Sequence, residues 1–145
     1  MADKAGVTLT ATLPDGPLPV RVGGRHLRQI VSNLLTNGIK FTASGGAVTL
    51  DVGVTDQRAI AIVVTDTGVG VSRSELQDLE RRFAWARAGA RGEKGYGLGL
   101  AIIRSILPVY NLSLEIDGKK GVGTTAKLTI PHSVRIANEN EPAAI

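Results

Sequence analysis

The chain has 145 residues, 43% of them apolar but only 3% aromatic, so it is long enough for one domain built on an aliphatic core. It has no cysteine, which excludes disulfides and thiolate metal sites, and no apolar run typical of a membrane span or a signal peptide. The net charge of +4 comes without basic runs interleaved with aromatic residues, so it favours a small polyanion at least as much as nucleic acid. We therefore expect a cytoplasmic domain that has no membrane span and does not bind nucleic acid.

Apolar periodicity predicts the order of the secondary-structure elements. In chain order these are a strand at residues 7–11, a helix at 25–41, strands at 47–54 and 59–65, a short helix from Ser72 towards Phe83, an apolar helix from about residue 95 to Pro108, and strands at 112–116 and 124–130. Such an order predicts an α+β fold: a two-layer α/β sandwich whose mostly antiparallel sheet carries helices on one face. We expect one domain over residues 1–132 and a flexible tail over residues 133–145.

The first predicted helix carries a polar stripe. Gln29, Asn33, Asn37 and Lys40 fall within about 80° of one another on a helical wheel. Asparagine is a poor helix former, so it is an unusual choice for a solvated face. Its amide oxygen can ligate a hard cation such as Mg²⁺, and a lysine ammonium can meet phosphate. The stripe alone leaves two interpretations open, a solvated face and a ligand site.

Asp66 follows the apolar run at residues 59–64 and precedes Gly68 and Gly70. A carboxylate at a strand end can accept a hydrogen bond from a buried ligand, and glycines allow a ligand to lie against the backbone. One alternative is an ordinary Asp-Thr-Gly turn. Another is half of an aspartic protease site, completed by a dimer partner. The long helix before the motif argues against a protease, because those enzymes are nearly all β.

Alternating glycines precede the second long helix. Gly95, Gly97 and Gly99 would present free backbone N–H groups at its start, where an anion can bind. Three cations stand in the loop before them: Arg87, Arg91 and Lys94. The spacing fits neither the dinucleotide fingerprint nor a Walker loop. The alternatives are glycines kept for close packing and a solvated run of charge.

These motifs, in this order, resemble those of the ATP-binding catalytic domain of sensor histidine kinases. That domain belongs to the GHKL superfamily, with the Bergerat ATP-binding fold, which also includes gyrase and Hsp90. The resemblance covers residues 29–42 (N box), 66–70 (G1 box), the region of Phe83 (F box), 95–100 (G2 box), and 121–125 with 128–131 (last glycine box and closing strand). Asn33 stands where the ATPases carry a catalytic glutamate, which favours the kinases.

The resemblance implies that Mg-ATP is the ligand and assigns roles to matching residues. Asn37, assisted by Asn33, would ligate Mg²⁺, and Lys40 would touch phosphate. Asp66 would accept a hydrogen bond from the adenine 6-amino group, and the G1 glycines would let the base approach. The other nucleotide-binding residues implied, beside Gly68 and Gly70, are Arg87, Arg91, Lys94, Gly95, Tyr96, Gly97, Leu98, Gly99, Leu100 and Thr125.

The implied activity is that of a protein-histidine kinase in two-component signalling. The γ-phosphate would pass to a histidine on a separate dimerisation domain, with a response regulator as an indirect partner. Neither His26 nor His132 lies in a phosphoacceptor context, so the chain alone is not expected to phosphorylate itself. The alternatives are a degenerate nucleotide- or partner-binding domain of the same fold and an anti-sigma-type serine kinase. Gly24, Gly38 and residues 109–111 depart from the family pattern, in place of a usual aspartate, an alanine and a His-Gly-Gly turn.

Overall fold

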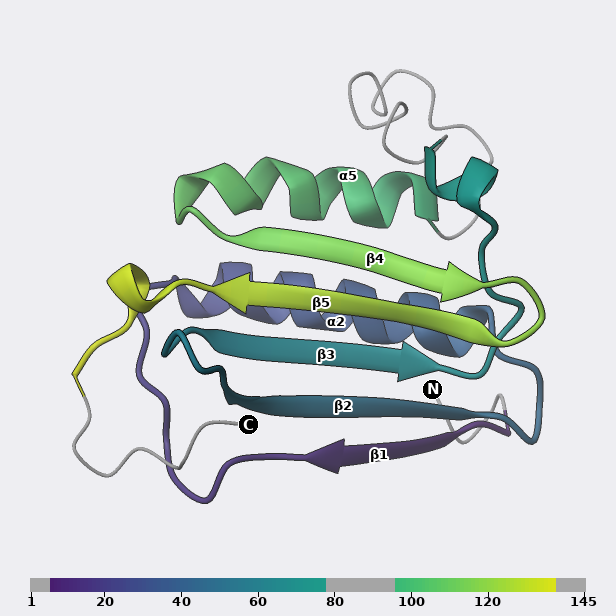
Figure 1. The fold of residues 1–145 in the computed structure, drawn as a ribbon, viewed down its shortest axis with the longest axis horizontal. Coiled ribbons are helices and arrows are strands. Elements are labelled where there is room, and N and C mark those ends of the chain that lie inside the picture. The colour runs from purple at the N-terminus through teal and green to yellow at the C-terminus, as the bar shows by residue number, and fades with distance from the viewer. Residues whose placement is uncertain (1–5, 78–95, 138–145) are drawn as a thin grey trace.

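The structure, a computed structural model, describes residues 6–77 and 96–137, and only the backbone of residues 96–99. Its elements are β1 (Thr8–Thr12), α2 (Gly24–Lys40), β2 (Ala47–Val54), β3 (Ile60–Asp66), α5 (Tyr96–Ile106), the 3-10 turn η1 (Leu107–Val109), β4 (Ser113–Lys119), β5 (Gly123–Ile130) and the 3-10 turn η2 (His132–Val134). Figure 1 shows the sheet face-on with the helices behind and above it. Within these two ranges no helix is long and apolar enough to cross a membrane.

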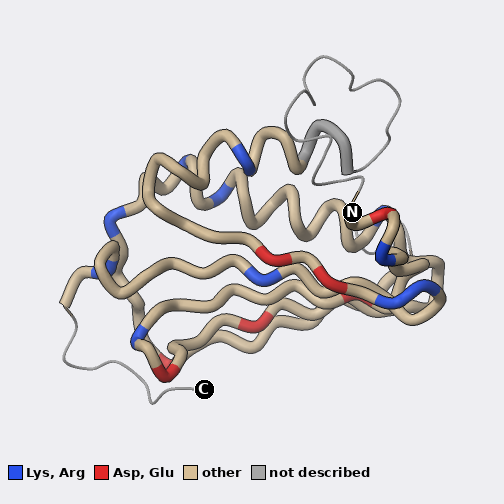
Figure 2. The backbone as a smooth tube through the Cα atoms, turned by 45° about the horizontal axis from the view of Figure 1, so that its top comes forward, with Lys and Arg blue, Asp and Glu red and all other residues tan. Residues whose placement is uncertain are grey.

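The five strands form one sheet in the order β1-β2-β3-β5-β4. β1 runs parallel to β2 and the other neighbours are antiparallel. Two adjacent parallel strands need a crossover connection, and α2 supplies it. Both helices lie on one face of the sheet (Figure 2). The predicted two-layer α+β fold is therefore confirmed.

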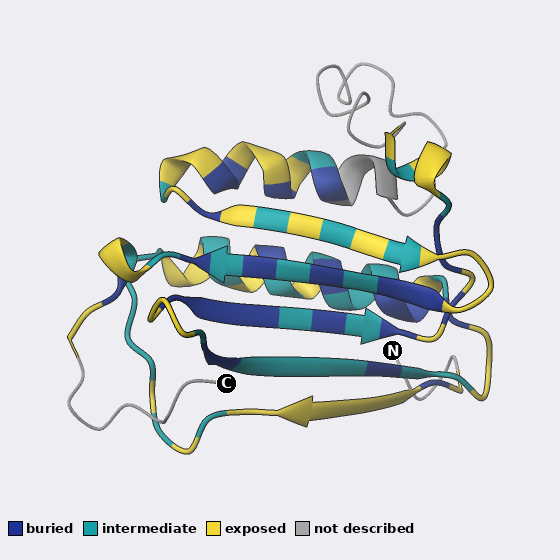
Figure 3. Cartoon of the chain, in the orientation of Figure 1, coloured by how far each residue is buried: buried dark blue, intermediate teal, exposed yellow. Residues whose placement is uncertain are grey.

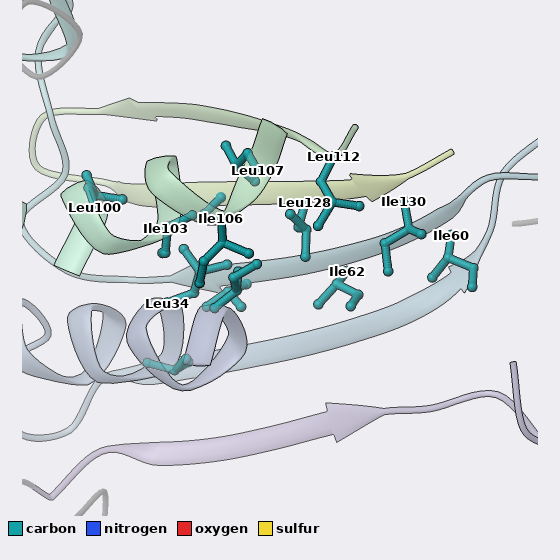
Figure 4. Packing of buried hydrophobic residues seen from close by; sticks show 14 of the residues in the cluster. Leu34, Ile60, Ile62, Leu100, Ile103, Ile106, Leu107, Leu112, Leu128 and Ile130 are labelled. Carbon is teal, nitrogen blue, oxygen red and sulfur yellow. The ribbon is translucent and has the colours of Figure 1, made fainter. Parts of the chain in front are cut away.

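The core lies between the helices and the sheet and is aliphatic, as the composition predicts. Ile30 of α2, Ile103 of α5 and Leu128 of β5 have no exposed surface, and the side chains of the two layers meet in Figure 4. Fully burying such a side chain contributes about 1.5–3 kcal/mol. From Thr124 to the end of β5 every second residue is buried, because successive side chains of a strand point to opposite faces. The other face of the sheet carries no helix, and most of its residues are half-buried or exposed (Figure 3).

The chain continues in regular structure beyond two predicted boundaries. β4 extends to Lys119 instead of ending at residue 116, because its pairing with β5 continues to Gly123. Residues 133–137, predicted to be part of a flexible tail, are tied to the segment after β1. Arg135 forms a β-bridge with Val20, and Ile136 N–H donates to the Pro19 carbonyl at 3.0 Å. Backbone hydrogen bonding, which apolar periodicity does not report, accounts for both differences.

Candidate functional site

Asp66, the last residue of β3, is the buried carboxylate of the candidate site. Its side chain is 7% exposed, and Oδ1 accepts hydrogen bonds from Gly68 N–H at 2.8 Å and Thr124 N–H at 3.2 Å. Burial raises the pKa of the Asp66 carboxyl, and these two bonds lower it by less. No residue in the described parts of the chain donates to Oδ2. Asp66 is thus fixed by one oxygen and retains the other as an acceptor.

The loop after Asp66 is held by main-chain hydrogen bonds from three directions. Thr67 N–H donates to the Ala47 carbonyl at 3.1 Å, and Val69 N–H donates to the Phe41 carbonyl at 3.1 Å. The Val69 carbonyl in turn accepts from Gly121 N–H at 2.8 Å. The end of α2, the start of β2 and the β4–β5 turn therefore all fix this loop.

The two glycines of this loop allow close approach of the protein's own backbone. A Cβ atom at Gly68 would overlap the Phe41 carbonyl oxygen and stand 2.9 Å from the Phe41 carbonyl carbon. Gly70 has φ +74°, and a Cβ there would lie 2.7 Å from the Lys119 carbonyl carbon. Glycine is the residue that tolerates both requirements. The vacant Cβ positions of both glycines face the protein's own main chain, and the expected role of these glycines in letting a ligand approach stays a prediction.

The polar stripe of α2 lies at the flank of the helix. Asn33 and Asn37 are half-buried, and Lys40 is exposed. His26, two turns before Asn33, contacts Tyr110, and Tyr110 follows α5 and η1 in the chain. Residues seven apart share a helix face, so the stripe faces the α5 side. Half-burial distinguishes the two asparagines from an ordinary solvated stripe.

Gly38 brings the stripe and the carboxylate together. It follows Asn37 in α2, and a Cβ atom placed on it would lie 3.8 Å from Asp66 Cβ and 3.4 Å from Val48 Cγ1. The helix therefore approaches the sheet closely beside Asp66. Two groups predicted from separate motifs, the amides of α2 and the carboxylate of β3, lie at one end of the sandwich.

The glycine-rich segment forms the first turn of α5. The helix begins at Tyr96, so the N–H groups of Gly97 and Gly99 are among the first four, which have no partner within a helix. Leu100 is 1% exposed, and its side chain belongs to the hydrophobic core. Four other predicted residues lie outside the described residues: Arg87, Arg91, Lys94 and Gly95.

On β5 the residue beside Asp66 is Thr124, which was not among the residues predicted from the sequence. Thr124 is 6% exposed and lies directly opposite Asp66 in the β3–β5 register. The selected Thr125 lies opposite Thr65, on the face of the sheet without helices. The alternation of buried residues along β5, with Ala126 in the core, is the signal that could have placed Thr124 on the side of Asp66.

The predicted capping box lies near the same end of the sheet. Ser72 N–H donates to Glu75 Oε1 at 2.8 Å, and Glu75 N–H donates to Ser72 Oγ at 3.2 Å. Lys120 Nζ, in the β4–β5 turn, lies 3.2 Å from Glu75 Oε1. The Ser72 N–H, and then Lys120, lower the pKa of the Glu75 carboxyl. Both partners of this ion pair are exposed, so it adds little stability.

The start of α2 is capped from a distant part of the chain. Gly23 is the N-cap residue and supplies no side-chain cap. Its N–H donates to Tyr110 Oη at 3.2 Å, and Tyr110 Oη lies 2.6 Å from His26 Nδ1. Gly23 and Tyr110 are 87 positions apart in the sequence, and no local pattern links them.

Comparison with known proteins identifies the family. A family model described as histidine kinase-, DNA gyrase B- and HSP90-like ATPase matches residues 23–134. The chain belongs to this ATPase family. The resemblance found in the motifs is therefore confirmed.

The relatives of this ATPase-family chain include histidine kinases. Histidine protein kinase DivJ of Caulobacter vibrioides is 39% identical over 130 residues, which cover 90% of this chain and 22% of DivJ. The structure resembles the mycobacterial sensor histidine kinase MprB, with a TM-score of 0.72 and 26% identity over 89% of this chain and 84% of that one. It also resembles full-length ShkA in complex with AMPPNP, with a TM-score of 0.72 and 28% identity over 99% of this chain and 28% of that one. The chain thus spans about a fifth of the length of DivJ.

Proposed function

We propose that this chain is the ATP-binding catalytic domain of a sensor histidine kinase. The proposal is that it binds Mg-ATP and donates the γ-phosphate to a histidine on a dimerisation domain, from which a response regulator receives it. One observation carries it: the buried Asp66, with one oxygen fixed by two backbone N–H groups, lies against the α2 turn that carries Asn37. Membership of the ATPase family and the histidine kinase relatives support it.

The carboxylate suits adenine rather than guanine. Asp66 Oδ1 is occupied by Gly68 and Thr124, which leaves Oδ2 as an acceptor. Adenine presents an amino group at its 6-position, where guanine presents a carbonyl that would face the carboxylate unfavourably. A buried carboxylate discriminates strongly between the two bases. When it faces a carbonyl, both groups have lost their water and gain no hydrogen bond in return.

Mg²⁺ would be held by the amide stripe together with the phosphates. Mg²⁺ in nucleotide sites usually keeps few protein ligands and bridges the substrate phosphates. Asn33 and Asn37 are half-buried on one face of α2, and amide oxygens are hard ligands. Within residues 6–77 and 96–137 no group of three histidine, aspartate or glutamate side chains could hold an ion. The residues present therefore fit an ion bound mainly by the nucleotide, which would offset the charge of the transferred phosphoryl group.

The phosphates would lie towards the start of α5 and the end of α2. The first-turn N–H groups of α5 and the positive end of its dipole favour anions, and Lys40 adds an exposed ammonium at the last turn of α2. In phosphoryl transfer the protein contributes mainly positioning and electrostatic stabilisation. His26 Nδ1 lies 2.6 Å from the Tyr110 hydroxyl, so this nitrogen already has a partner within the domain.

Calorimetric titration of this chain with ATP, with and without Mg²⁺ and beside GTP, tests the proposal. We expect adenine-selective binding that strengthens with Mg²⁺. Asp66→Asn is the decisive variant, since its amide oxygen can still accept from both backbone N–H groups while an NH₂ donor replaces Oδ2. It should lose at least tenfold in ATP affinity, about 1.4 kcal/mol, and remain folded.

The alternatives give different results. No heat from a folded sample would favour a degenerate domain, and unchanged affinity in Asp66→Asn would overturn the adenine assignment. Incubation with γ-labelled ATP should leave no label on the chain itself. Retained label would contradict a phosphoacceptor on another domain.

A further inference from the structure

The two edges of the sheet differ in how they are protected. β1 and β4 are the edge strands. β4 carries Glu115, Asp117 and Lys119 at exposed positions, the kind of charged residues that discourage pairing at a free edge. β1 and the residue after it, Thr-Leu-Thr-Ala-Thr-Leu, carry no charge at all. Figure 2 shows β1 without a charged position.

The outer side of β1 faces no other strand in the part of the chain that the structure describes. All five residues are exposed (Figure 3), and Leu9 is 45% exposed. Thr8 N–H donates to the Gly46 carbonyl at 3.0 Å, so the even-numbered residues of β1 direct their backbone groups towards β2. Leu9 and Ala11 consequently direct theirs outward. In residues 6–77 and 96–137 the only strand paired with β1 is β2.

The sequence of β1 is complementary to itself when two copies run antiparallel. With Thr10 opposite Thr10 of a second copy, Leu9 lies opposite Ala11 and Thr8 opposite Thr12. The outward-facing groups are then those of Leu9 and Ala11, which would exchange about four main-chain hydrogen bonds across the two-fold axis. Threonine would meet threonine on one face and leucine would meet alanine on the other. Such β-branched and apolar pairs stabilise a sheet, and no like charges meet.

We propose that β1 is a self-association edge, through which two copies of this chain join their sheets in antiparallel register. Residues directly opposite each other in a sheet point to the same face, so the helices of both copies lie on the same side of the joined sheet. Two five-residue strands bury much less than the roughly 1,200 Å² of a stable interface. The dimer is therefore weak, with a dissociation constant on the order of 0.1–1 mM. This inference is independent of the proposed nucleotide site.

Sedimentation velocity of this chain over about 10 µM to 1 mM tests the proposal. We expect the mass to rise with concentration from 15.2 kDa towards twice that value. Ala11→Pro removes an outward N–H that β2 does not use, and it should hold the chain monomeric throughout. Leu9→Lys places like charges near each other where the two β1 strands pair, so it should also keep the chain monomeric. It is the variant to use if Ala11→Pro fails to fold. Val109→Lys is the matched control, because Val109 is 63% exposed on η1 and away from β1.

Amide hydrogen exchange distinguishes a dimer formed through β1 from another part of the chain that covers β1. In a dimer the N–H groups of Leu9 and Ala11 become protected as concentration rises, while Thr10 N–H, already bonded to β2, changes little. Protection of Leu9 and Ala11 in dilute samples would mean that another part of the chain covers the edge, and it would overturn the proposal. A monomer at the highest concentration, or a dimer that persists in both variants, would also overturn it.

Discussion

Tyr110→Phe tests the long-range cap of α2. The change deletes the hydroxyl that accepts from Gly23 N–H at 3.2 Å and lies 2.6 Å from His26 Nδ1, and it leaves the ring in place. A side-chain N-cap contributes about 1 kcal/mol, and a partly buried hydrogen bond adds about 0.5–1.5 kcal/mol. Because water can replace the exposed bond to Gly23, we expect a total loss of about 1.5 kcal/mol. For a chain of this length the unfolding midpoint then falls by about 3–6 °C.

Urea unfolding followed by far-ultraviolet circular dichroism measures this loss, and Gly23→Asp provides the sharper control. A Cβ at Gly23 lies 3.0 Å from Tyr110 Oη, so an aspartate there is crowded in the native sequence. When Tyr110→Phe has removed that oxygen, the aspartate can cap the helix itself. We expect Gly23→Asp to be neutral or destabilising alone and stabilising in the Tyr110→Phe background. Equal effects in both backgrounds would refute the cap.

Two further predictions concern the packing and titration of the Asp66 end. Gly38→Ala should stabilise the fold by about 0.5–1 kcal/mol, because its nearest contact, at 3.4 Å to Val48, is ordinary van der Waals distance. The same change at Gly68 should destabilise it by at least about 1 kcal/mol, since the methyl meets the Phe41 carbonyl; equal effects in denaturant titrations would contradict this account. The pKa of Asp66 is raised in the folded state, so protonation of Asp66 stabilises the fold. This contribution to the free energy of unfolding is fully present at pH values below the unfolded pKa and is lost as the pH rises through the folded pKa. The stability of Asp66→Asn relative to the native chain should therefore increase over that window in unfolding curves, and a constant difference would show that the pKa is not raised.

Local pattern predicted the elements, and local chemistry predicted part of the site. The 3.6-residue period marked α2, and the alternation of residues marked the strands. Asparagine on a helix suggested ligand chemistry because it is a poor helix former, and aspartate after a buried strand did so because its carboxylate can accept a hydrogen bond from a buried ligand. The contact of Gly38 with Asp66 depends on how α2 crosses the sheet, and no local pattern carries that information. Thr124 and Thr125 look alike in sequence, and the strand register alone separates them.

The manner in which the loop after Asp66 is held affects how freely the sequence can change around it. Its supports are the main-chain carbonyls of Phe41 and Ala47 and the N–H of Gly121, and every residue except proline offers both kinds of group. The side chains of Phe41 and Ala47 can therefore be exchanged over evolutionary time without displacing the carboxylate, whereas Gly121 has φ +84° and favours glycine. The positions next to Asp66 without room for a side chain are Gly68, Gly70 and Gly123, each of whose Cβ atoms would meet a main-chain carbonyl. A family built on such a loop can diverge widely and still be recognised from a few glycines and one aspartate.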